Sequence, residues 1–142
     1  MEIVEVAPDD PRLDDVYPVM HELRTEMSPD DFRTTYAAGF EGGYRVVGLF
    51  DEGVCRAAAG YHITYGFLHG RFMYIDDLVT GAEHRSRGYG KILNDYLAGV
   101  AADQGCRSVQ LDSGTHRIDA HRFYFREGYV ITSFHFVDKI ST

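Results

Sequence analysis

The stretch RFMYIDDLVTGAEHRSRGYGKIL, residues 71–93, decides the fold of this chain. Its first ten residues, which end at Thr80, mix β-branched, aromatic and aliphatic side chains as a strand does. From Tyr89 onward, apolar residues recur at helical spacing as far as Ala101, and Gly105 is typical of a helix end. A basic loop with closely spaced glycines lies between these two segments. The stretch therefore predicts a strand, a tight turn and a helix.

The loop between this strand and this helix has the features of an anion site. The first turn of a helix leaves about four backbone N–H groups without intrahelical partners and has partial positive charge. Gly88 and Gly90 have no Cβ, so an anion can approach the backbone closely. Arg85, Arg87 and Lys91 add formal positive charge. We therefore expect an anionic ligand at this turn.

Two common phosphate-binding patterns fail here at a defining position. The dinucleotide pattern GxGxxG requires glycine where this chain has Leu93, and a P-loop requires Ser or Thr where it has Ile92. The pattern that fits is R-x-x-G-x-G, from Arg85 to Gly90. Taken alone, these residues also fit a solvated basic loop without a ligand.

The residues before this stretch predict a strand, two helices and a hairpin. Alternation in EIVEVA predicts a strand at about residues 2–7, and apolar spacing over residues 13–27 predicts a helix that Pro18 kinks or delays. The sequence SPDDF, residues 28–32, has the N-cap, the proline and the acidic third residue of a capping box. It predicts a second helix that reaches about Gly39.

The remaining segments complete a mixed sheet. The turn DEG, residues 51–53, predicts a hairpin with Gly53 in a left-handed conformation, and a second turn leads into the strand at 71–80. After the helix, SVQLD predicts a short strand, residues 117–127 a helix and YVITSFHFV, residues 129–137, a last strand. The strand–helix–strand unit needs a right-handed parallel crossover, whereas the preceding strands form an antiparallel meander. The predicted fold class is α/β, with helices on the faces of a mixed sheet.

Length and composition indicate one globular domain. The 142 residues are 44% hydrophobic and 25% charged, which is ordinary for a water-soluble domain, so we expect residues 1–142 to form a single domain. No apolar run is long enough for a signal peptide or a membrane span, and the expected compartment is the cytoplasm. Cys55 and Cys106 lie far apart and predict free thiols rather than a disulfide or a metal pair.

The negative charge is concentrated at the N-terminal end. Ten acidic residues and two arginines lie in residues 1–31, so this segment holds all of the net charge of −8. If these residues share a face, their field repels nucleic acid and favours a cationic partner. Solvated helix surfaces are the alternative interpretation.

Two signatures resemble the GNAT-type N-acetyltransferase superfamily, and the resemblance extends over nearly the whole chain. In that family R/Q-x-x-G-x-G/A binds the pyrophosphate of acetyl-CoA through backbone N–H groups, and residues 85–90 match it fully. AHRFYFREGY, residues 120–129, matches a second signature that contains a tyrosine four residues after an alanine. The resemblance implies a GNAT-like fold, a central mixed sheet with about four helices, and acetyl-CoA as co-substrate.

The resemblance also implies how the coenzyme is held. The pantetheine arm pairs with the strand before the loop, so the Leu78 N–H should face the acetyl carbonyl and Thr80 should pair with pantetheine. The family more often has Val at the position of Thr80. The implied coenzyme-binding residues are Leu78, Val79, Thr80, Arg85, Ser86, Arg87, Gly88, Tyr89, Gly90 and Lys91.

The resemblance implies two catalytic residues. Tyr124 matches a tyrosine that in many members protonates the departing thiolate, and a phenol retains its proton at neutral pH; a core tyrosine is the alternative. Strand alternation predicts that Asp76 and Asp77 face opposite sides, with Asp76 on the side of Leu78 and Thr80. Asp76 matches the place of a strand glutamate that draws a proton from the amine in some members, although others carry that glutamate where this chain has Tyr74. A structural carboxylate is the alternative.

Other constellations are weaker. Many relatives have an asparagine where this chain has Arg117, which is either a surface or helix-start residue or a contact to the coenzyme phosphates. His116, His121, Asp112 and Asp119 do not have the spacing of a metal site, and we expect no metal. The sequence also lacks the G-x-S-x-G element of serine hydrolases.

The sequence therefore predicts an N-acetyltransferase that transfers acetyl from acetyl-CoA to a primary amine, on a cationic small molecule or a lysine-bearing peptide. Two alternatives stay open: a non-catalytic acetyl-CoA-binding module, and an acyltransferase for longer acyl chains. We expect no nucleic acid or membrane partner. A homodimer is possible, because dimers are frequent in the family.

Overall fold

The structure is a computed structural model that describes residues 1–141. It consists of two compact units, one of residues 1–111 and the other from residue 112 onward. Among the described residues, no helix combines the length and the apolar character that crossing a membrane requires.

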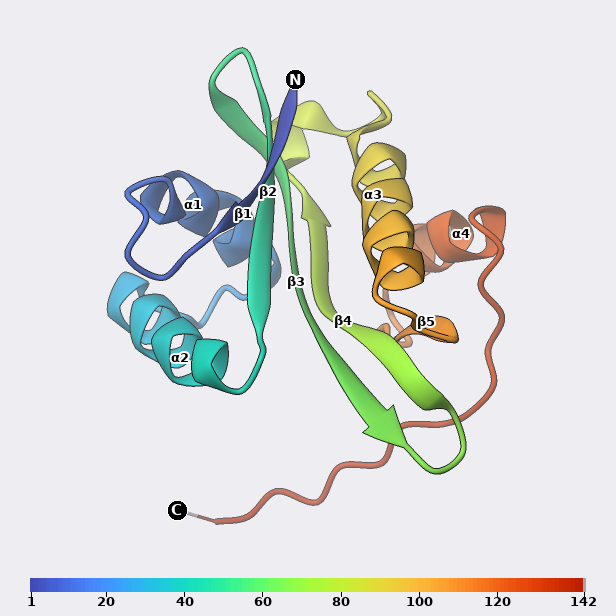
Figure 1. Ribbon diagram of the computed structural model, residues 1–142. Helices are drawn as coiled ribbons and strands as arrows, with labels where there is room; N and C mark the ends of the chain where they lie inside the picture. The colour runs from blue at the N-terminus through green and yellow to red at the C-terminus, as the bar shows by residue number, and fades with distance from the viewer. Residues whose placement is uncertain (142) are drawn as a thin grey trace. The chain divides into compact units, whose positions relative to one another are not determined.

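The first unit is a five-stranded sheet with helices on its faces (Figure 1). The strands lie in the order β1-β2-β3-β4-β5, and all neighbours are antiparallel except β4 and β5, which are parallel. In chain order the elements are β1 (Glu2–Val6), α1 (Leu13–Leu23), α2 (Pro29–Glu41), β2 (Arg45–Asp51), β3 (Val54–Gly66), β4 (Gly70–Thr80), the 3-10 turn η1 (Ala82–His84), α3 (Tyr89–Asp103) and β5 (Ser108–Leu111). The predicted mixed sheet with its parallel crossover is confirmed.

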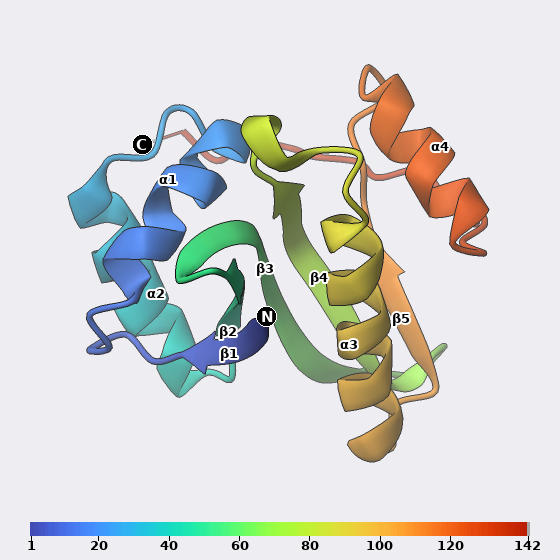
Figure 2. The same cartoon turned by 90° about the horizontal axis from the view of Figure 1, so that it is seen from above.

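The sheet separates two hydrophobic cores. Helices α1 and α2 cover one face and α3 the other, as the view from above shows (Figure 2). The core under α1 and α2 contains Val16, Met20, Phe32, Tyr36 and Val46 among its buried residues. The core under α3 contains Leu49, Met73, Ile75, Leu93 and Leu97. Apolar alternation on the central strands thus supplies both cores.

Local sequence signals explain where the helices and the first hairpin begin and end. The Ser28 hydroxyl accepts the Asp31 N–H at 3.0 Å and the Asp31 carboxylate accepts the Ser28 N–H at 3.4 Å, which confirms the capping box at α2. Glu52 and Gly53 both have positive φ, 55° and 75°, in the tight turn between β2 and β3. Helix α1 begins at Leu13, so Pro18 lies within it and does not delay it.

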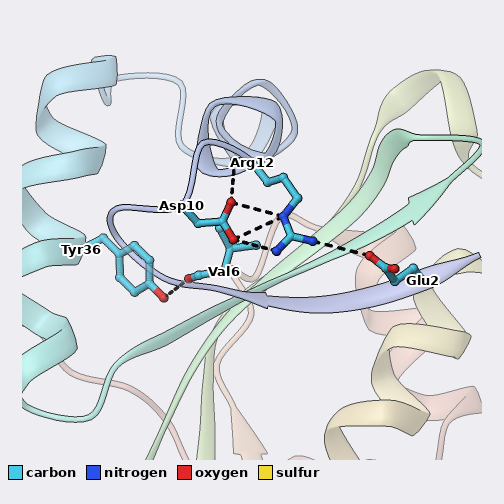
Figure 3. Close-up of polar contacts among 5 residues, drawn as sticks. All are labelled: Glu2, Val6, Asp10, Arg12 and Tyr36. Carbon is cyan, nitrogen blue, oxygen red and sulfur yellow. Dashed lines mark hydrogen bonds and ion pairs between the residues drawn. The ribbon is translucent and has the colours of Figure 1, made fainter.

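Polar contacts fasten helices α1 and α2 to the edge strand β1 (Figure 3). The Asp10 carboxylate accepts the backbone N–H of Arg12 at 2.9 Å and a guanidinium N–H of Arg12 at 2.8 Å. The same guanidinium lies 3.5 Å from the Glu2 carboxylate. On α2, the Tyr36 hydroxyl donates to the Val6 carbonyl. These contacts stabilise the position of both helices on their face of the sheet.

Strand β4 contains a bulge at Asp76. In the β3–β4 register, Asp77 lies opposite Gly60 and Ile75 lies opposite Tyr61, so Asp76 is an extra residue on β4. A bulge interrupts the alternation of side chains between the two faces. The prediction that Asp76 and Asp77 face opposite sides rests on unbroken alternation, and the contacts of the two side chains show that it is wrong.

The second unit contains α4 (Ile118–Arg126) and an extended C-terminal segment. Gly128, with φ of 94°, follows the helix, and the Tyr129 N–H donates to the Tyr124 carbonyl at 2.9 Å. The predicted strand at residues 129–137 is not formed. Alternation predicts a strand only if a neighbouring strand satisfies its backbone groups, and the described part of this unit contains none. The α4 prediction is confirmed.

The two thiols should differ sharply in reactivity. Cys55 is 5% exposed, and burial raises the pKa of its thiol to about 12, so almost no thiolate forms near pH 8. Cys106 is half-buried. We expect a maleimide to label Cys106 in the native protein and to reach Cys55 only after unfolding, as read by peptide mass spectrometry. Native Cys106→Ser should stay unlabelled; equal labelling rates at the two sites would contradict this expectation.

Candidate active site

The C-terminal half of β4 has an open edge within the first unit. Strand β5 pairs with β4 only from Phe72 to Ile75, so β4 continues beyond its neighbour. On the other edge, the Gly81 N–H donates to the Arg56 carbonyl of β3 at 2.9 Å. Because N–H groups alternate in direction along a strand, those of Thr80 and Leu78 point toward the open edge. This edge offers backbone groups to an extended ligand.

The predicted anion site lies directly after this edge, at the start of α3. Gly88 is the N-cap residue with φ of 81°, and the first intrahelical bond runs from the Ile92 N–H to the Gly88 carbonyl at 3.1 Å. The N–H groups of residues 89–91 therefore precede the helical ladder. Arg85, Ser86, Arg87 and Gly88 are all exposed. A Cβ on Gly88 would meet open space, so an anion can approach this backbone freely.

Two predicted coenzyme-binding residues have side chains engaged elsewhere. The buried Tyr89 hydroxyl donates to the Asp51 carboxylate at 2.7 Å, which fastens the start of α3 to the end of β2. The Lys91 ammonium lies 3.3 Å from the Asp95 carboxylate, one turn along the helix. Tyr89 thus offers its backbone N–H, rather than its hydroxyl, to a ligand.

The bulge brings both carboxylates of β4 to the face covered by α1 and α2. Asp77 accepts from the Tyr44 hydroxyl at 3.0 Å and from the Arg24 guanidinium at 2.5 Å. Asp76 lies 2.8 Å from Nδ1 of His62 on β3. Leu78, in contrast, packs against the core under α3. Asp76 therefore does not share the side of Leu78, and the correction follows from the one-residue bulge.

His62 is a candidate site residue that the sequence prediction missed. Its ring stacks against Tyr44, with centroids 6.5 Å apart, and tilts toward Tyr74 at 5.6 Å. Burial raises the pKa of Asp76, and the hydrogen bond from His62 opposes this shift. A carboxylate on one imidazole nitrogen fixes the ring and leaves the other nitrogen able to exchange a proton. The signal in the sequence is a histidine on the neighbouring strand, but its register cannot be read from the sequence.

Half of the ten acidic residues in residues 1–31 line one of two separate hollows. Asp14, Asp15 and Glu22 line a cleft of about 510 Å³ beside residues 81–84. Within it, the Glu22 carboxylate accepts the Ala82 N–H at 2.8 Å. Glu26 and Asp31 line a separate cavity under α1 and α2. The acidic residues therefore do not gather at one place.

The second unit holds the other predicted catalytic residue. Tyr124 is half-buried on α4, and its ring meets Phe123 at 5.5 Å and Tyr129 at 5.6 Å between centroids. Burial raises the pKa of Tyr129 to about 12, with a further contribution from Tyr124. Arg117 is the N-cap residue of α4.

Comparison with known sequences identifies the family. The model of the acetyltransferase (GNAT) family matches residues 12–129. An uncharacterized N-acetyltransferase of Bacillus subtilis strain 168, YhdJ, is 38% identical over 122 residues, which are 84% of this chain and 86% of that protein. The aminoalkylphosphonate N-acetyltransferase of Salmonella typhimurium strain LT2 is 29% identical over 132 residues, 89% of this chain and 84% of that protein.

Solved structures share the fold. The aminoglycoside N-acetyltransferase AAC(6')-Iy in complex with CoA superposes with a TM-score of 0.86 at 14% identity, over 99% of this chain and 95% of that one. The ribosomal-protein-alanine N-acetyltransferase of Brucella melitensis biovar Abortus 2308 gives 0.82 at 17% identity, over 99% and 100%. Because the family model matches most of this chain, the chain belongs to the acetyltransferase (GNAT) family and is an acyltransferase.

Proposed function

We propose that this enzyme transfers the acetyl group of acetyl-CoA to a primary amine of a cationic small molecule or a lysine-bearing peptide. The observation that supports this most directly is the continuity of the open β4 edge with the anion site. An extended arm lying along residues 77–80 would deliver its phosphates to the backbone at residues 88–91. That is the shape of a coenzyme with a pantetheine arm and a pyrophosphate.

The coenzyme-binding residues would contact different parts of the coenzyme. The backbone N–H groups at the start of α3 would hold the pyrophosphate, and exposed Arg85 and Arg87 would add charge. Bound acetyl-CoA supplies the thioester. The Leu78 N–H, on the open edge, would donate to the acetyl oxygen and stabilise the negative charge that develops there.

The proton leaves the amine through His62. An ammonium cannot attack a carbonyl carbon until it loses a proton, and the imidazole of His62 would accept that proton. Asp76 then acts through His62 as a positioning residue, since its carboxylate already contacts Nδ1 at 2.8 Å. The amine nitrogen forms a bond to the acetyl carbon, the carbon–sulfur bond breaks, and the thiolate takes a proton from Tyr124. The second proton that the amine nitrogen loses then restores the Tyr124 hydroxyl. Direct proton abstraction by Asp76 is the simpler alternative.

Tyr124 is the residue whose assignment rests on the family signature. We expect Tyr124→Phe to lower kcat about 100-fold, in the range for loss of a general acid, with the acetyl-CoA dissociation constant changed by less than about threefold. Tyr129→Phe, on the same unit, is the matched control and should retain most activity. A Tyr124→Phe enzyme with unchanged kcat would assign the proton to water or another group.

The function itself is tested by separating coenzyme binding from turnover. Calorimetry with acetyl-CoA measures binding, and release of free thiol over a panel of amines measures transfer. Acetylated product from any primary amine supports the proposal. Binding without turnover on every amine would favour a non-catalytic module, and faster turnover with longer acyl-CoA donors would change the assigned donor.

A further inference from the structure

A cavity of about 670 Å³ opens on the face of the sheet covered by α1 and α2. Much of its lining is apolar and is contributed by α1, the segment after it, α2 and β2: Met20, Leu23, Met27, Phe32, Tyr36 and Val46. This volume lies within the range of small-molecule sites, which are largely apolar with a few polar groups that orient the ligand. The cavity therefore fits a compact apolar group.

One end of the cavity is polar and belongs to the proposed active site. Asp77 and Tyr44 both line it, and the Tyr44 hydroxyl donates to the Asp77 carboxylate at 3.0 Å. Tyr44 also stacks on His62, the partner of Asp76. Asp77 directly precedes Leu78, whose N–H points to the open β4 edge. The Asp77 end of the cavity is thus separated from His62 by the Tyr44 ring and is one residue away from Leu78.

Arg24 is the cation bound to Asp77 at the polar end of the cavity, and another cation can replace it. The Asp77 side chain is 14% exposed, and its ionic partner Arg24 is 52% exposed at the end of α1. Because the Arg24 side chain is exposed, it can move into solvent when a second cation takes its place on Asp77, giving up its hydrogen bonds to Asp77 at 2.5 Å and to the Asp76 carbonyl at 3.1 Å. Asp77 itself is fixed by the Tyr44 hydroxyl, so it keeps its place when the guanidinium moves away.

We propose that this cavity is the acceptor subsite, and that the acceptor is a primary amine on a hydrophobic aryl or alkyl body. The apolar body fills the cavity under α1 and α2, and the ammonium group takes the place of the Arg24 guanidinium on Asp77. This inference rests on the proposed acetyl transfer and narrows its acceptor.

The lining also disfavours sugar amines. A sugar would bring hydroxyl groups against Met20, Leu23 and Phe32, whose side chains offer them no hydrogen-bond partner, whereas Glu26 and Asp31, which also line the cavity, offer acceptors to a second ammonium group. Burying a polar group without such a partner costs about 1–3 kcal/mol in proteins. An ammonium group at the Asp77 end and an apolar remainder therefore match the apolar part of the lining better than a sugar does.

The test is a substitution that fills the cavity from its rim. Thr35 lines the cavity from an exposed position on α2, and its neighbour Thr34 is exposed but does not line it. We expect Thr35→Phe to raise the dissociation constant of phenethylamine about tenfold, measured by calorimetry with coenzyme A present, because a bulky group in an apolar pocket costs at least this factor. Thr34→Phe should leave it unchanged, and neither variant should alter acetyl-CoA binding.

Turnover separates this inference from the function on which it rests. With acetyl-CoA, kcat/KM should be highest for phenethylamine and hexylamine and lower for spermidine and glucosamine. The subsite would be overturned, with acetyl transfer intact, by either of two results. One is a preference for spermidine or glucosamine, and the other is a phenethylamine dissociation constant that Thr35→Phe leaves unchanged. Phenethylamine binding that weakens in Thr35→Phe, without acetylation of any amine, would support the cavity and contradict the proposed function.

Discussion

We expect His62→Gln to lower kcat by about 100-fold or more, because general acid–base catalysis contributes factors of this size. Glutamine keeps a hydrogen-bonding side chain next to Asp76 but cannot accept a proton from an ammonium. Steady-state thiol release at saturating acetyl-CoA and amine measures the effect. His69→Gln, in the exposed turn between β3 and β4, is the matched control and should retain wild-type kcat. Loss of less than about threefold in His62→Gln would place the base elsewhere.

The pH profile separates a relay from a structural pair. Burial raises the pKa of Asp76, so as the pH falls this carboxylate becomes protonated at a higher pH than an exposed aspartate, whose ordinary value is about 3.9. Once protonated, it no longer offers His62 Nδ1 a carboxylate acceptor. The acid limb of kcat should therefore move to lower pH in Asp76→Asn, because asparagine does not titrate, with a smaller loss of kcat than in His62→Gln. If Asp76→Asn lowers kcat but does not shift the acid limb of the pH profile, the Asp76 carboxylate has a purely structural role.

The second large effect is expected for Gly88→Asp. This change places a carboxylate at the N-cap of α3, where it competes with a bound anion for the N–H groups of the first turn. Aspartate tolerates a left-handed φ better than most residues, so α3 should still form. We expect the acetyl-CoA dissociation constant to rise about 100-fold, equivalent to about 2.8 kcal/mol, as measured by calorimetry.

The control for this change lies on the same helix. Gly99 is exposed within α3, and a Cβ there meets no atom within 4 Å, so Gly99→Asp makes the same substitution about three turns from the anion site. It should leave acetyl-CoA binding unchanged. Equal weakening in both variants would mean that net charge, rather than the helix start, governs binding.

Features that depend on neighbours in sequence are predictable. The capping box of Ser28 and Asp31, the turn at Gly53 and the start of α3 all follow from residues within one turn of each other. The two family signatures likewise lie in short segments, so the amino-acid sequence by itself indicates the acetyltransferase family.

Features that depend on strand register are not predictable in this way. The contact between His62 and Asp76 joins residues on different strands, and the bulge that permits it shows only in the pairing of β3 with β4. The strand predicted at residues 129–137 fails for a related reason. Its alternation is a local property, whereas a strand exists only through hydrogen bonds to another segment. Long-range pairing thus decides the parts of the site that sequence periodicity leaves open.

The bulge has a consequence for how this enzyme tolerates change. Asp76 and Asp77 face the same side because β4 has one residue more than β3 between two successive pairs of opposing residues. A substitution at either aspartate alters one side chain and leaves the backbone path intact. A deletion or an insertion at this point instead shifts the alternation of side chains along β4, which turns one carboxylate toward the core under α3. Selection should therefore act more strongly against insertions and deletions at this point than against substitutions.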